Sequence, residues 1–102
     1  MTIVRGTTPT VDYSFSTIDP RTLDACYMTI SQDGETIIER DSETMNATST
    51  TASWELTQED TLGLIAGKKC EIQLRYVTSG GLAYASAISS VEVLDVLKKG
   101  VI

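Results

Sequence analysis

The most regular alternation of apolar and polar residues runs over 69–90. Its first arm places apolar and polar side chains on opposite faces: Cys70, Ile72, Leu74 and Tyr76, against Glu71, Gln73 and Arg75. Successive side chains of a strand point to opposite sides of a sheet, so a period of two predicts a half-buried strand. Ser79-Gly80-Gly81 then supplies the positive φ angles of a tight turn, and residues 82–90 alternate again. The stretch predicts a β-hairpin against which the rest of the chain packs.

Four further stretches have the composition of strands. Residues 10–16 alternate cleanly, and residues 25–32 place Cys26, Met28 and Ile30 on one face. Asp33-Gly34 is a strong signal for a two-residue turn, because both residue types tolerate positive φ. It predicts a hairpin with 35–40, where the adjacent Ile37 and Ile38 cannot share one face. We expect a bulge there, or a contact of one isoleucine with a neighbouring element. The fourth strand, 52–56, carries Trp54, which is expected to anchor the core.

The remaining segments are less regular. Residues 41–51 are rich in Ser, Thr and acids, which favours a long loop or an edge strand. Thr57 stands three residues before Asp60, a spacing that resembles a capping box and predicts a short helical turn over 58–62. The tail, 91–102, suits either a last strand or one turn of helix.

About seven short strands separated by turn signals predict an all-β fold, an antiparallel β-sandwich. A chain of 102 residues has the length of one domain, so we expect residues 1–102 to form a single β-sandwich domain. No repeat and no linker composition divides it.

The charge balance limits the classes of partner. Eight basic and fourteen acidic residues give a net charge of −6, and a chain of this sign is not expected to bind nucleic acid or an anionic membrane. No apolar run approaches the ~20 residues of a membrane span. The start, residues 1–6, lacks the apolar region of a secretory signal, so we expect the protein to be made in the cytoplasm. Cys26 and Cys70 are then expected to be buried thiols; a disulfide between facing sheets is the alternative.

The sequence offers little catalytic chemistry. It has no histidine, the commonest general base and metal ligand, and it has no phosphate-binding or nucleophile-elbow motif. The acids that could pair for catalysis are expected to be solvated: Asp33, Glu35, Glu55, Glu59 and Asp60. Asp41-Ser42-Glu43 lacks the spacing of a calcium loop. We therefore expect no enzymatic activity, no cofactor and no metal.

Several short motifs resemble those of a known family. Arg5-Gly6-Thr7-Thr8-Pro9-Thr10 before an alternating strand is similar to the opening of the N-terminal immunoglobulin-like domain of siphophage baseplate upper proteins, which typically reads Arg-Gly-Asp/Thr-Thr-Pro-Thr. Further matches to compact prophage proteins of Firmicutes type lie at 29–32, 56–62, 71–75 and 96–102. The resemblance implies an immunoglobulin-like sandwich and a virion component. The partners we expect are other virion or prophage structural proteins, which could include copies of this chain. The resemblance carries over no catalytic residues.

Two pairs of residues are the candidate partner contacts. Val101 and Ile102 form an apolar chain end that could add to a neighbour as a strand or enter its groove. Thr48 and Thr50 lie in a Thr-rich stretch that could present hydroxyls to a sugar or to a partner edge; the alternative is an exposed strand of high β-propensity. The alternative function is a free-standing binding module for a carbohydrate or a host surface protein, which would need exposed aromatic residues; the candidates are Tyr27, Trp54 and Tyr84.

Overall fold

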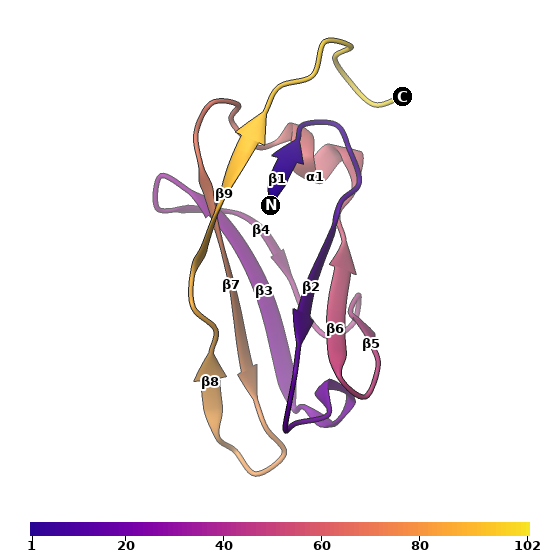
Figure 1. Cartoon of the computed structure of the whole chain (residues 1–102), viewed down its shortest axis with the longest axis vertical. Coiled ribbons are helices and arrows are strands. Elements are labelled where there is room, and N and C mark those ends of the chain that lie inside the picture. Colours follow the sequence, from indigo (N-terminus) through magenta and orange to yellow (C-terminus); the bar gives the residue numbers. More distant parts are fainter.

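The computed structural model describes residues 1–102 as two packed sheets (Figure 1). One sheet has the order β1-β9-β7-β3-β4, with β8 also paired to β7, and the other has the order β2-β6-β5. The strands are β1 Thr2–Val4, β2 Thr10–Ser14, β3 Ala25–Gln32, β4 Glu35–Arg40, β5 Asn46–Ala47, β6 Thr51–Glu55, β7 Cys70–Val77, β8 Ala83–Ala85 and β9 Ser89–Leu94; the helices are η1 Pro20–Thr22 and α1 Gln58–Leu62.

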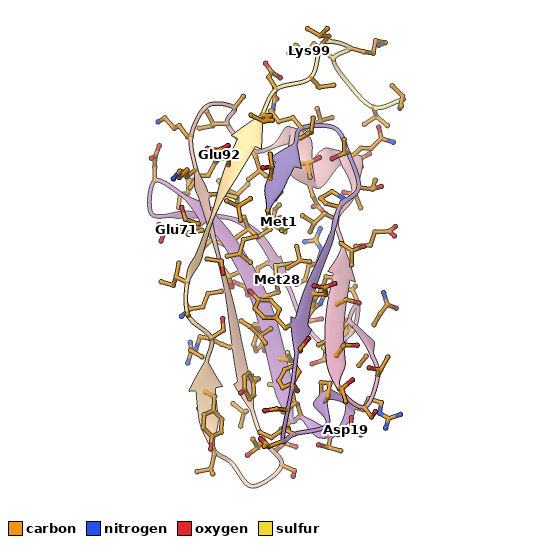
Figure 2. The ribbon with its side chains drawn as sticks, in the orientation of Figure 1. Met1, Asp19, Met28, Glu71, Glu92 and Lys99 are labelled. Carbon is orange, nitrogen blue, oxygen red and sulfur yellow. The ribbon has the colours of Figure 1, made fainter.

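The core lies between the two sheets and is built from the alternating positions. A cluster of 15 buried apolar residues fills it, and Met28, labelled in Figure 2, lies at its centre. Trp54 is 1% exposed and donates from its indole Nε1 to the Asp41 carbonyl oxygen at 2.9 Å. It is the core anchor that the sequence predicts. Each sheet buries one face, because period-two strands cannot bury both.

The first hairpin confirms the turn signal at Asp33-Gly34. Both residues have positive φ, 51° and 76°, and they join β3 to β4. A register shift follows Ile30, so that Ile30 pairs with Ile38 while Ser31 pairs with Thr36. The bulge leaves Ile37 without a paired residue in β3, and its partly buried side chain packs against the edge of the core near Gly63, at the end of α1.

In the second hairpin, the predicted strand β7 and its turn are confirmed, but the prediction for the return arm is wrong. The Thr78 amide donates to the Leu82 carbonyl oxygen at 2.9 Å, and Gly81 has a φ of 83°. Residues 82–90 do not form one continuous strand: β8 pairs with Arg75–Val77, and β9 pairs with Cys70–Ile72. The face predicted to be buried here is open, with Leu82 and Ile88 exposed; burial resumes only at Val91 and Val93.

The segments between the hairpins follow their local signals. The segment 41–51 holds the two-residue edge strand β5. The predicted capping box opens α1: the Asp60 amide donates to Thr57 Oγ1 at 3.1 Å, and the Thr57 amide donates to Asp60 Oδ2 at 2.9 Å. The tail contributes the strand β9 and then continues without regular structure. Neither helix has the length and apolar content needed to cross a bilayer.

Both cysteines are buried free thiols. They lie at opposite ends of the β3–β7 pair, since Cys26 is in register with Tyr76, six residues along β7 from Cys70. At about 3.3 Å per strand residue this separation is about 20 Å, far beyond the ~7 Å that a disulfide allows. The pairing of Cys26 with Cys70 is therefore excluded in the folded chain. Burial raises the pKa of Cys26 to about 11 and also raises the pKa of Cys70.

Candidate interaction surfaces

The predicted tail contact projects from one end of the sandwich. Leu97 is fully exposed, Val101 is 52% exposed and Ile102 is 88% exposed. Figure 2 shows the segment that carries Lys99 standing beyond the two sheets. The chain end is held to α1 through Gln58, whose Oε1 accepts from the Ile102 amide at 2.8 Å. The tail thus presents apolar side chains while its backbone is anchored.

The base of the tail is fixed by charge. Arg5 Nη1 and Lys99 Nζ each approach Asp95 Oδ1 at 2.8 Å. Hydrogen bonds from the side chain of Lys99, from the Val96 amide and from Arg5 hold the pKa of the Asp95 carboxyl well below its usual range. The bridge between Arg5 and Asp95 joins the loop after β1 to the segment after β9.

The other predicted pair, Thr48 and Thr50, lies at the β5–β6 turn. Thr48 Oγ1 accepts from the amides of Thr50 and Thr51, at 3.3 Å and 3.0 Å, and lies 2.7 Å from the Thr51 hydroxyl. Both threonines are exposed. The tail and this turn lie beyond opposite ends of β6, so the structure does not bring the two predicted pairs into one site (Figure 1).

The motif at residues 5–10, which carries the family resemblance, is held by hydrogen bonds to later parts of the chain. Arg5 Nη2 donates to the Leu62 carbonyl oxygen at 2.9 Å, and the Thr61 hydroxyl donates to the Thr7 carbonyl oxygen at 2.9 Å. The Leu56 amide donates to the Pro9 carbonyl oxygen at 2.9 Å. Residues 5–10 therefore tie the start of the chain to α1 and β6.

The three candidate aromatic residues do not form a shared platform. Trp54 is buried, whereas Tyr27 and Tyr84 are 44% and 45% exposed. Tyr27 is in register with Arg75, while Tyr84 pairs with Tyr76, the next residue of β7. Because adjacent strand residues face opposite sides, the two exposed tyrosines point to opposite faces of their sheet.

The acidic residues are dispersed or serve structural roles. Asp60 closes the capping box and bonds Arg40 Nη2, and Asp33 bridges Lys68 at 2.7 Å. Burial works against ionisation of Asp60, but the Thr57 amide and the Arg40 side chain outweigh it and lower the pKa of this carboxyl. No group of three or more His, Cys, Asp or Glu residues is placed to hold a metal ion.

An open sheet edge that the sequence patterns did not single out lies at β8. In the β7–β8 ladder, the Thr78 amide bonds Leu82 and the Ser86 amide bonds the Leu74 carbonyl oxygen at 2.8 Å. The hydrogen-bonded pairs of an antiparallel ladder alternate with non-bonded ones. The intervening partners Ala83 and Ala85 therefore direct their amide and carbonyl groups away from β7. Figure 1 shows β8 at the outside of its sheet.

β8 and the residues that flank it in the sequence are uncharged, although Arg75 of β7 is in register with Ala85. Residues 76–91 contain no Asp, Glu, Lys or Arg, in a chain that is 22% charged. Leu82 and Ile88 are 60% and 57% exposed. A cavity of about 190 Å³ that no charged residue lines lies between the sheets near Ser86; its walls include Tyr13, Phe15, Leu74, Tyr76 and Ser86. The missing charge over 76–91 is the signal in the sequence that would have marked this surface.

Comparison with solved structures places the fold. The Ig-like domain of mouse leukocyte-associated immunoglobulin-like receptor 1, crystallised as a strand-swapped dimer, aligns with a TM-score of 0.54 and 17% identity. The alignment covers 92% of this chain and 86% of that one. The protein has an immunoglobulin-like β-sandwich fold. Its sheet orders agree with this, because such sandwiches split their strands into two sheets by Greek-key connections.

The other comparisons add no family. The V domain of amphioxus IgVJ-C2 aligns over 92% of this chain and 99% of its own length, but with a TM-score of 0.36 and 10% identity the likeness is too distant to carry an argument. No protein-family profile matches the chain. No curated protein matches it in sequence.

Proposed function

We propose that the protein is a non-enzymatic assembly subunit: an immunoglobulin-like domain that binds other structural proteins of a phage or prophage virion. The observation that carries the proposal is the tail, which holds Leu97, Val101 and Ile102 exposed to solvent beyond the sheets. Exposed apolar side chains on a projecting segment are what a neighbouring subunit can bury. The fold suits this role, since it can present loops, edges and chain ends from a rigid body.

Two further observations support the proposal. The motifs at 5–10 and 96–102 resemble those of baseplate proteins and prophage proteins. In addition, the mouse receptor domain with a similar fold was crystallised as a strand-swapped dimer, which is an example of an assembly made through strands. The proposed partners are other virion or prophage proteins, including copies of this chain, and neither nucleic acid nor a membrane. The protein would be made in the bacterial cytoplasm and then enter the particle.

The virion role is tested by following the protein into particles. Particles released from an induced lysogen that carries the gene are purified on a density gradient, and their proteins are quantified by mass spectrometry. We expect this chain in a fixed ratio to the major structural proteins, and reading frames for capsid, tail-tube or tape-measure proteins beside its gene. Its absence from the particles, with polysaccharide-utilisation genes on either side, would contradict the proposal.

The contribution of the tail is tested in the same particles. Deletion of Gly100–Ile102 removes two exposed apolar side chains and the bond to Gln58, so we expect the fold to persist and incorporation to fall. Ile65→Glu is the matched control, because Ile65 is also an exposed apolar residue, at 50%, but lies outside the tail. Equal incorporation of the deleted and full-length chains would show that the tail is not the contact.

A further inference from the structure

The open edges of the two sheets are protected in different ways. Of the six residues of β4, the outermost strand of its sheet, Glu35, Glu39 and Arg40 are charged. In the other sheet, β2 carries Asp12 and β5 is only two residues long. Charged side chains and short strands are the ordinary means by which proteins prevent edge-to-edge pairing. Like β1, β8 is only three residues long, and neither strand carries a charged residue that would block pairing.

The backbone of β8 is ready to accept another strand. Ala83 and Ala85 turn their amide and carbonyl groups outward, as the alternation of the β7–β8 ladder requires. Their methyl side chains leave the approach to these groups unobstructed. Unpaired groups along an edge are a template for a strand from another chain.

Charge decides which partner fits. Each copy of the chain has a net charge of −6, so two copies repel each other least where neither presents acidic side chains. Residues 76–91 provide such a surface. Of the charged residues labelled in Figure 2, Glu71, Glu92 and Lys99 lie toward the other end of the molecule, whereas Asp19 lies at the same end as β8 but on the opposite side in this view. A charged partner would find no opposite charge on this surface, whereas a second copy would present the same uncharged surface.

We infer that two copies of the chain pair through β8 in an antiparallel arrangement, with a two-fold axis at Tyr84 that joins their larger sheets into one. In this register Ala83 of each copy bonds to Ala85 of the other. The inference deepens the proposed function, because it names a second copy as one partner and gives it a surface separate from the tail.

The side chains support the same register. Tyr84 stacks on Tyr76 with ring centroids 5.5 Å apart, and Tyr76 packs edge-on against Phe15 at 5.3 Å. Directly opposed residues of a non-hydrogen-bonded antiparallel pair have Cβ atoms about 4.5–5.5 Å apart, a distance at which aromatic side chains interact. The half-exposed Tyr84 rings would therefore meet across the axis and extend this aromatic row from one copy to the other.

The test compares proline substitutions at two edges. Ala85→Pro removes an amide that faces away from β7. Ala47→Pro is the control, because it removes an amide of β5 that faces away from β6. The bond from the Thr48 amide to the Thr51 carbonyl oxygen makes Ala47 the outward-facing residue of that ladder. Proline is tolerated at such positions. Sedimentation at up to about 0.5 mM protein measures dimerisation. We expect dimers for the wild type and for Ala47→Pro, and at least about tenfold weaker association for Ala85→Pro.

A second variant and the tail deletion complete the test. Ala83→Lys places a charge on the same edge and is used if circular dichroism shows that Ala85→Pro does not fold; it is expected to weaken dimerisation as strongly. The chain lacking Gly100–Ile102 is expected to dimerise like the wild type. A monomeric wild type, or dimers that survive both β8 substitutions, would overturn the β8 inference. Dimers lost only on tail deletion would also overturn it, while supporting the tail contact of the proposed function.

Discussion

The two ends of the sandwich are built on different principles. At the α1 end, side chains bond the loops to one another: Gln32, Arg5 and Asp60 each reach a segment far away in the sequence. At the β8 end, residues 76–91 carry no charge, and the side-chain bonds are more local: Arg21 pairs with Asp19 at the start of η1, and Gln73 and Ser86 bond across one ladder. The comparison teaches that the α1 end is fixed by specific polar bonds, whereas the β8 end leaves a strand edge unsatisfied and available.

Substitution of one glutamine at each end is expected to give the largest difference between the ends in the free energy of unfolding. Gln32 is 3% exposed, accepts from the Ile65 amide at 2.7 Å, and donates to the carbonyl oxygens of Ile65 and Lys68 at 3.0 Å and 3.2 Å. Gln32→Ala leaves partly buried backbone groups of Ile65 and Lys68 unpaired, and we expect a loss of about 2–3 kcal/mol in the free energy of unfolding.

The matched substitution at the β8 end is Gln73→Ala. Gln73 is only partly buried and makes one bond, to the Ser86 carbonyl oxygen at 3.0 Å. We expect a loss of about 0.5–1.5 kcal/mol, the value of one ordinary hydrogen bond. Urea unfolding followed by Trp54 fluorescence measures both variants. Equal losses at the two positions would remove the distinction drawn between the two ends.

Part of the stability of the α1 end depends on the ionised carboxylate of Asp60 and is lost at acidic pH. Its pKa is lowered in the folded chain, so its contribution is fully present above the unfolded pKa of about 3.9 and is lost as pH falls through the folded value. We expect Asp60→Asn to cost about 1 kcal/mol at pH 7, where the bond to Arg40 is charge-assisted. The difference from the wild type should shrink below about pH 4. A difference that does not change with pH would show that the ionised carboxylate is not what stabilises the helix start.

The reactivity of the two thiols measures smaller, local unfolding at each end of the sandwich. Cys26 is in register with Tyr76 near β8, while Cys70 begins β7 near α1. With the pKa of Cys26 at about 11 and that of Cys70 also raised, a thiol reagent at pH 8 reacts mainly through local unfolding. In the single variants Cys70→Ala and Cys26→Ala, we expect the remaining Cys26 to react about tenfold faster than the remaining Cys70. Faster reaction of Cys70 would show that the α1 end opens more readily than the β8 end, which would contradict this expectation.

The sequence predicted the strands that carry strong apolar alternation and the turns that carry glycine. It predicted β3, the Asp33-Gly34 turn and the capping box at Thr57 because each depends on contacts within a few residues. It failed at the return arm, where Ser86 replaces regular pairing: the Ser86 hydroxyl accepts from the Leu74 amide and donates to the Ala87 carbonyl oxygen, both at 3.0 Å. Serine side chains compete with the backbone in this way, and alternating Ala and Ser give little preference for a face.

The candidate surfaces were only partly predictable. The tail was found from its terminal apolar residues, Val101 and Ile102, and the structure leaves both exposed. The edge of β8 was missed because which edge stays open depends on the pairing of β1 with β9 and of β8 with β7. These contacts join residues far apart in the sequence, so no local pattern encodes them.

Amide hydrogen exchange at β8 tests the central claim, that this open edge pairs with a second copy, without changing any residue. The Tyr84 amide faces β7 and should be protected at every protein concentration, whereas the amides of Ala83 and Ala85 face outward. Between about 10 µM and about 1 mM protein, where weak dimers form, exchange at Ala83 and Ala85 should become markedly slower while exchange at Tyr84 stays constant. Rates at Ala83 and Ala85 that do not depend on concentration would contradict the account.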